Sequence, residues 1–245
     1  MILRRVIAHF RKQEWTAIAI DFVIVVLGVF VGLQVNNWNE RQGDRRKESA
    51  YLQRLHDDIA SLRADTTLDE RSVKTRNAYL HAAMASFESR DPAQLAELGS
   101  EHCSAIVRSH IYASAIVTPP TIGEILQSGE VGLIQDPELR VAILRFDEAV
   151  EDMSQLRTDL QIDRRSLGRV YSAYIKVGLR RWEDSECRFA ELIDDQGFLN
   201  DFADNLRRDD AFTSAVIGRL NTIQRELHAT LDERLAIAHD PEAAP

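Results

Sequence analysis

The chain has little cysteine, proline or aromatic residue: 245 residues include 2 cysteines, 6 prolines and 7% Phe, Trp and Tyr. Two cysteines are too few for a small disulfide-dense secreted scaffold, and 11 glycines exclude a collagen-like fibre. No proline occurs between Met1 and Asp91, or between Glu138 and Asp240. Long helices are therefore permitted in both stretches.

Common catalytic motifs are also missing from the sequence. It contains no Gly-x-Ser-x-Gly, no glycine-rich phosphate loop and no His-Glu-x-x-His. The readily recognised hydrolase, nucleotide-binding and zinc-protease sites are thereby excluded. We predict that the protein is not an enzyme and uses no cofactor.

Two side-chain clusters were considered as metal or acid-base sites. Glu101-His102-Cys103, with His110 eight residues further on, has ligand types that suit zinc but too few convergent ligands. We interpret it as structural, and we predict no metal site. The neighbouring polar residues His56-Asp57-Asp58 point to different sides of a helix, and we interpret them as a solvated face.

The charge is unevenly distributed along the chain. The net charge is −9, but residues 1–48 hold 8 basic and 5 acidic groups, which leaves 22 basic against 34 acidic groups in residues 49–245. An acidic body is unfavourable for binding a phosphate backbone. We therefore expect no nucleic-acid partner.

One long apolar run lies near the N-terminus. Residues 16–35 contain thirteen Ile, Val, Leu or Phe in twenty positions, and such a helix reaches about 30 Å, the thickness of a bilayer core. The thirteen apolar residues contribute roughly −0.3 to −0.6 kcal/mol each, which outweighs a cost of about 3 kcal/mol for Asp21. A cleavable signal peptide normally has a shorter apolar region followed by small residues. We predict an uncleaved transmembrane signal-anchor helix over residues 16–36.

The flanks of this run suggest how it sits in a bilayer. Trp15 and Trp38 bracket the span, and indoles settle at the headgroup level, so we predict that both are interfacial anchors. Four basic residues lie on each side of the span, so the positive-inside rule decides nothing. Residues 1–15 form a basic amphipathic segment that suits an anionic leaflet, which favours a cytoplasmic N-terminus. The alternative is an ordinary basic flank with no lipid specificity.

One face of the apolar helix carries the features of a helix-helix contact. At 100° per residue Ala17, Val25, Gly28 and Gly32 all lie within about 40° of Asp21. The GxxxG spacing of the two glycines permits close approach of two helices in lipid, and an acidic group on the same face favours a protein partner. The alternative is that glycine is common in such helices and that Asp21 lies near the interface and stays hydrated. We predict a homo-oligomer or a pairing with another membrane protein, with the lipid bilayer as the surrounding medium.

The stretch DFVIVVLGVFVGLQVNNWNE, from Asp21 to Glu40, resembles the N-terminal signature of a family of uncharacterised bacterial single-pass membrane proteins. That signature is an acidic residue, an apolar run interrupted by glycine, and an ending Leu-Gln-Ile/Val-Asn-Asn-Trp-Asn-Glu. A looser match lies at Pro119–Leu139, PPTIGEILQSGEVGLIQDPEL. The resemblance implies a single-pass protein of the bacterial inner membrane, with a helical soluble domain and no assigned activity. The family often carries a longer, lysine-rich tail before the span, so the periplasmic placement of the domain is expected from the basic amphipathic N-terminal segment and not from the resemblance.

The remaining chain predicts an all-α soluble domain over residues 51–238, after a polar juxtamembrane connector at 37–50 and before a disordered tail at 239–245. Apolar residues recur every three or four positions, and three or four such helices need one another to bury their apolar faces. An antiparallel helical bundle is therefore expected, with no convincing strand. The helix boundaries that the sequence predicts are Asp91-Pro92 to Gly99, Pro120 to Ser128-Gly129, a start at Asp136-Pro137 and a final long helix from Asp210.

Cys103 and Cys187 are the only cysteines, so they form the only possible disulfide within the chain. In an oxidising compartment a bond between them closes about 84 residues and is worth about 2–4 kcal/mol. In the cytoplasm both are expected to remain thiols. The disulfide and the placement of the domain outside the cytoplasm therefore depend on each other.

Two functions follow as hypotheses. The first is a non-enzymatic envelope membrane protein that pairs through its transmembrane helix and presents the bundle to an envelope partner. The alternative is a sensor-type ligand-binding bundle that signals through a separate cytoplasmic partner, because helices near a membrane can transmit ligand-induced shifts.

Overall fold

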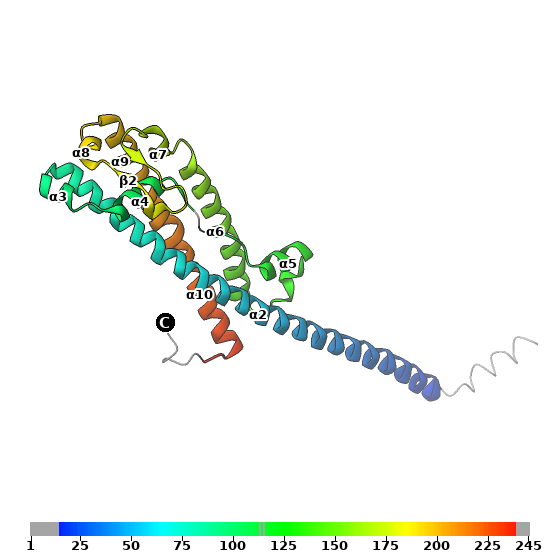
Figure 1. Cartoon of the computed structure of the whole chain (residues 1–245). Coiled ribbons are helices and arrows are strands. Elements are labelled where there is room, and N and C mark those ends of the chain that lie inside the picture. The colour runs from blue at the N-terminus through cyan, green and yellow to red at the C-terminus, as the bar shows by residue number, and fades with distance from the viewer. Residues whose placement is uncertain (1–14, 113, 115, 239–245) are drawn as a thin grey trace, which may run out of the picture. The chain divides into compact units, whose positions relative to one another are not determined.

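A computed structural model describes residues 15–112, 114 and 116–238, with side chains from Ile20 onward (Figure 1). The expected amphipathic segment at 1–15, apart from the backbone of Trp15, and the expected tail at 239–245 lie outside the described residues. The chain divides into two compact units, residues 1–50 and residues 51–245, which are treated separately below.

Helix α2 (Trp15–Ser89) supplies the described part of the first unit. This helix is long and apolar enough to cross a membrane: the mean hydropathy of its best 18-residue window is 1.8, and none of that window is buried. The helix continues through residues 37–50, so the polar connector is helical.

The second unit is mainly helical and has almost no strand, which confirms the all-α prediction. After α2 the chain forms α3 (Pro92–Ala96), α4 (Ser100–Arg108), α5 (Pro120–Ser128), η1 (Glu130–Leu133), α6 (Pro137–Gln161), α7 (Leu167–Val170), β1 (Ile175–Lys176), η2 (Trp182–Asp184), β2 (Glu186–Cys187), α8 (Phe189–Leu192), α9 (Gln196–Ala211), η3 (Phe212–Gly218) and α10 (Arg219–Leu235).

Local capping chemistry sets several of these boundaries where the sequence predicts them. The Asp91 carboxylate accepts a hydrogen bond from the backbone of Ala93 at the start of α3. Asp136 caps α6 in the same way, with proline in the first turn of both helices. Gly129 ends α5 with a φ of 72°, a left-handed conformation that glycine adopts without strain.

The C-terminal helices differ from the expectation of a final helix from Asp210. Helix α9 already begins at Gln196, where the Asp195 side chain accepts a hydrogen bond from the Phe198 backbone. It continues into η3, a π-helical segment, and then into α10. The π-helical turn changes the number of residues per turn, so the spacing of apolar residues shifts there. For this reason the apolar residues from Phe212 onward predict a separate helix.

The expectation of no strand was wrong in one small place. β1 and β2 form an antiparallel pair in which Ile175 lies opposite Cys187 and Lys176 lies opposite Glu186. Two residues per strand are too short for an alternating apolar pattern to be visible in the sequence.

Two apolar cores follow one another along α2. Figure 1 shows the helices that pack along α2 to form them. In the first, residues 52–73 of α2 pack with α5, α6, η3 and α10. In the second, residues 80–87 of α2 pack with α4, α7, β1, α8 and α9. Both cores are helix-on-helix, and together they form a helical bundle.

Candidate functional site

The predicted face of the apolar helix is open in the structure. Asp21, Val25, Gly28 and Gly32 are all exposed, and a Cβ atom added at either glycine would meet no atom within 4 Å. The side chains of Trp15 and Ala17 lie outside the described residues, whereas Trp38 is 66% exposed. Nothing in the described part of the chain covers this face.

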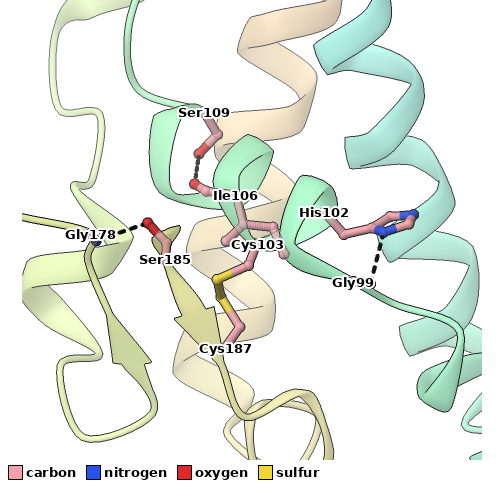
Figure 2. Close-up of a disulfide and its surroundings, with 8 residues drawn as sticks. All are labelled: Gly99, His102, Cys103, Ile106, Ser109, Gly178, Ser185 and Cys187. Atoms are coloured by element: carbon pink, nitrogen blue, oxygen red, sulfur yellow. Dashed lines mark hydrogen bonds between the residues drawn. A yellow bond between two sulfur atoms is a disulfide. The ribbon is translucent and has the colours of Figure 1, made fainter. Parts of the chain in front are cut away.

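A disulfide braces the second apolar core. Cys103 on α4 and Cys187 on β2 are bonded, with their Cα atoms 5.6 Å apart, and they are 84 positions apart in the sequence (Figure 2). Cys103 is 1% exposed, and it belongs to the same core cluster as Phe198 and Phe202. The bond therefore ties the β1–β2 hairpin to the buried side of α4.

The connection between β1 and β2 is closely packed at Gly178. The Gly178 N–H donates a hydrogen bond to Ser185 Oγ over 3.1 Å, as Figure 2 shows. A side chain at Gly178 would overlap the backbone carbonyl oxygen of Arg181. This connection contains η2 and so places Glu183 beside α4.

A pocket of about 340 Å³ lies between α2, α4 and η2. It falls within the size range of small-molecule sites, at the lower end. Its charged lining consists of three arginines and two glutamates, and the remaining lining is mainly hydroxyl-bearing and small residues. The charged residues are Arg71, Arg76, Arg108, Glu101 and Glu183.

Arg76 lies at the buried side of this pocket. Its side chain is 8% exposed, its Nη2 donates to Asp209 Oδ1 over 2.5 Å and its Nη1 donates to the Ile111 carbonyl over 2.9 Å. Its Nε is buried and has no hydrogen-bond partner among the described residues. Burial raises the pKa of Asp209 above its usual range, and the Arg76 guanidinium opposes that shift.

Glu183 on η2 adds a carboxylate to the pocket lining. A hydrogen bond from its own backbone N–H lowers the pKa of its carboxyl, and Arg181 and Arg108 lower it further. Because Arg76 is paired with Asp209, Arg71 and Arg108 face Glu101 and Glu183, and the lining suits a small ligand that carries an anionic group for the two arginines. A polar or cationic group on the same ligand suits the glutamates.

The metal-like cluster considered in the sequence does not assemble. His102 Nδ1 accepts a hydrogen bond from the Gly99 N–H over 3.1 Å, and Cys103 is in the disulfide (Figure 2). His110 is partly buried, and burial together with Arg164 lowers its pKa.

The interpretation of His56-Asp57-Asp58 as a solvated face was wrong for two of the three residues. The His56 side chain is 13% exposed, and Asp58 accepts a hydrogen bond from the Thr121 backbone over 3.0 Å at the start of α5. Only Asp57, at 73% exposed, fits the solvated interpretation. His56 lies beside His228 and Asp232, and the i, i+4 spacing of the last two on one helix is the signal for this cluster in the sequence.

Comparisons with known proteins find no match: no family model, no curated protein and no solved structure is similar to this chain. The resemblance of Asp21–Glu40 to the bacterial membrane-protein family therefore remains a prediction.

Proposed function

We propose that the protein is a non-enzymatic, single-pass membrane protein of the bacterial envelope, anchored by residues 16–36, with its helical domain in the periplasm. The observation that carries the proposal is the apolar part of α2, whose large side chains from Ile20 to Val35 are each about half exposed or more. An apolar surface of this extent is stable in a bilayer and unfavourable in water.

The anchor also associates with a second transmembrane helix, which is either a second copy of the chain or another membrane protein. Asp21, Gly28 and Gly32 share one side of α2, and the two glycines leave the backbone open to close approach. A carboxyl group within the span is most stable when it faces a partner rather than lipid.

A membrane dimerisation reporter tests the association. Asp21→Leu and Gly32→Ile should each reduce the signal, because one removes the polar contact and the other adds bulk between the backbones. Phe30 lies about 180° from Asp21 on a helix, so Phe30→Leu is the matched control and should leave the signal unchanged. A reporter signal that is unaltered in both Asp21→Leu and Gly32→Ile would contradict the association.

A second function, ligand binding by a sensor-type bundle, is supported by the pocket between α2, α4 and η2. Ligand binding there bridges α2, α4 and η2 and transmits the change to a separate cytoplasmic partner. A thermal-shift screen of the full chain in detergent, using small carboxylates and phosphate esters, tests this function.

Arg108→Gln should abolish any stabilisation found in that screen, because it removes one of the pocket's cations. Arg207 is the control, since it is 72% exposed and does not line the pocket. If no compound raises the Tm, or if Arg207→Gln has the same effect as Arg108→Gln, the pocket does not bind these anions.

A further inference from the structure

Three potential metal ligands converge at the other end of the domain from the disulfide, within the first apolar core region. His56 is contributed by α2, and His228 and Asp232 lie one turn apart on α10. One ligand atom from each of the three lies within 4.8 Å of the other two. His56 is 172 positions from His228 and 176 positions from Asp232, so the fold brings distant parts of the chain to one small site.

Asp232 lies between the two imidazoles. Its Oδ1 is 2.9 Å from His56 Nε2, and its Oδ2 is 2.9 Å from His228 Nδ1. The two imidazole rings lie beside each other, with centroids 4.7 Å apart and planes tilted by 35°. His56 Nε2 and His228 Nδ1 therefore both point toward the Asp232 carboxylate.

This spacing is close to the requirement of a transition-metal ion. Zn²⁺ binds imidazole nitrogen and carboxylate oxygen at about 2.0–2.1 Å, so neighbouring ligand atoms in a tetrahedral site are about 3.3 Å apart. The two nitrogen-to-oxygen distances of 2.9 Å need only widen slightly, and a small rotation of the rings closes the remaining gap. Three protein ligands leave one coordination position for water or another group.

The surroundings also suit a metal site. The side chains of His56, His228 and Asp232 are 13%, 8% and 16% exposed, so the ligands are held by packing but remain reachable from solvent. Asp57 Oδ1 lies 3.4 Å from His56 Nδ1. A carboxylate beside Nδ1 orients the imidazole so that Nε2 is the ligating atom, an arrangement common at metal-ligating histidines.

We propose that His56, His228 and Asp232 bind a divalent transition-metal ion of the zinc class, which joins α10 to α2. Imidazole and carboxylate ligands select this class over Mg²⁺ and Ca²⁺, which prefer oxygen ligands alone. This proposal does not depend on the function proposed above.

Zinc binding to the full chain in detergent tests the site. After the protein has been stripped with a chelator, equilibrium dialysis against Zn²⁺ should give one ion per chain, and the Tm should rise with added Zn²⁺. Substitution with Co²⁺ should give the visible absorption bands of a low-coordinate site with nitrogen and oxygen ligands. Absence of stoichiometric Zn²⁺ and of these bands in the wild-type chain would overturn the proposal without recourse to any variant.

Variants then assign the ligands. His228→Gln and Asp232→Asn should each weaken Zn²⁺ binding by tenfold or more, and Asp57→Asn should weaken it by about tenfold. His81→Gln is the matched control, because His81 Nε2 lies 2.7 Å from Asp210 Oδ1 in an exposed pair with no second histidine. Zn²⁺ binding that survives both His228→Gln and Asp232→Asn, or that is lost equally in His81→Gln, would place the ion elsewhere.

Discussion

Arg76 and Asp209, which are 133 positions apart in the sequence, form a buried ion pair that joins α2 to α9, with 2.5 Å between Nη2 and Oδ1. On α2, Arg76 lies between Val73 of the first core and Leu80 of the second. On the C-terminal helices, Asp209 lies in the same way between Leu206 of the second core and Phe212 of the first. The pair therefore forms a polar layer between two apolar cores, and its arginine also lines the pocket.

Removing one partner of this ion pair should be costly. Asp209→Ala leaves the Arg76 guanidinium buried without its counter-charge, and we expect the free energy of unfolding to fall by about 3–5 kcal/mol. Urea denaturation of the full chain in detergent, followed by circular dichroism, measures the change.

The double variant Arg76→Met, Asp209→Leu provides the control for this prediction. It removes both charges and keeps apolar volume, so it should be more stable than Asp209→Ala. A double variant no more stable than the single one would mean that the loss comes from packing rather than from the unpaired charge.

The disulfide should stabilise the second core. Replacing both cysteines, as Cys103→Ala with Cys187→Ala, should lower the free energy of unfolding by about 2–4 kcal/mol, because the bond closes a loop of 84 positions. A reducing agent should lower the Tm of the wild-type chain and leave the Tm of the double variant unchanged. Equal sensitivity of the two proteins to reduction would contradict the predicted role of the bond.

Tyr112 predicts an alkaline loss of stability. Its side chain is buried and stacks on Phe212, and burial followed by the field of Asp209 raises its pKa to about 12. The unfolded chain releases the same proton near pH 10, so the folded state loses stability as the pH rises from about 10 to about 12.

Tyr112→Phe keeps the aromatic stacking and removes this proton. Because the Tyr112 hydroxyl has no hydrogen-bond partner among the described residues, the variant should be at least as stable as the wild type at pH 7. Its Tm should fall less than that of the wild type between pH 10 and pH 12. Parallel Tm profiles for the two proteins would show that Tyr112 does not contribute to the alkaline transition.

Gly178→Ala should disrupt the hairpin that carries Glu183. The added Cβ would overlap the Arg181 carbonyl oxygen, so the turn must move and with it one side of the pocket. Limited proteolysis should show faster cleavage between residues 178 and 185 than in the wild type. Gly132→Ala is the control, since an added Cβ there meets nothing within 4 Å. Equal cleavage rates in Gly178→Ala and Gly132→Ala would contradict the predicted steric overlap at Gly178.

The sequence predicts the helix boundaries best where capping is local. Asp91-Pro92 and Asp136-Pro137 mark helix starts, and Gly129 marks an end, because in each case the deciding hydrogen bonds or dihedral angles involve residues within one turn. The apolar helix near the N-terminus is predicted for the same reason, since a continuous run of apolar residues needs no knowledge of the rest of the chain.

The candidate sites depend on contacts that local patterns do not contain. His56 and Asp232 are 176 positions apart, and the pocket combines residues of α2, α4 and η2. A pair such as His228 and Asp232 shows at most that two ligands share a helix face. Which third residue joins them is decided by the packing of α10 against the rest of the bundle.

The placement of the helical domain outside the cytoplasm is tested most directly by thiol labelling in intact cells. Leu179 is fully exposed, so Leu179→Cys in a chain that also carries Cys103→Ala and Cys187→Ala offers a single reachable thiol. We predict that a membrane-impermeant maleimide labels this residue in intact cells as strongly as in permeabilised cells, and that native Cys103 and Cys187 label only after reduction. Labelling of residue 179 only after permeabilisation would place the domain in the cytoplasm and contradict the proposed orientation.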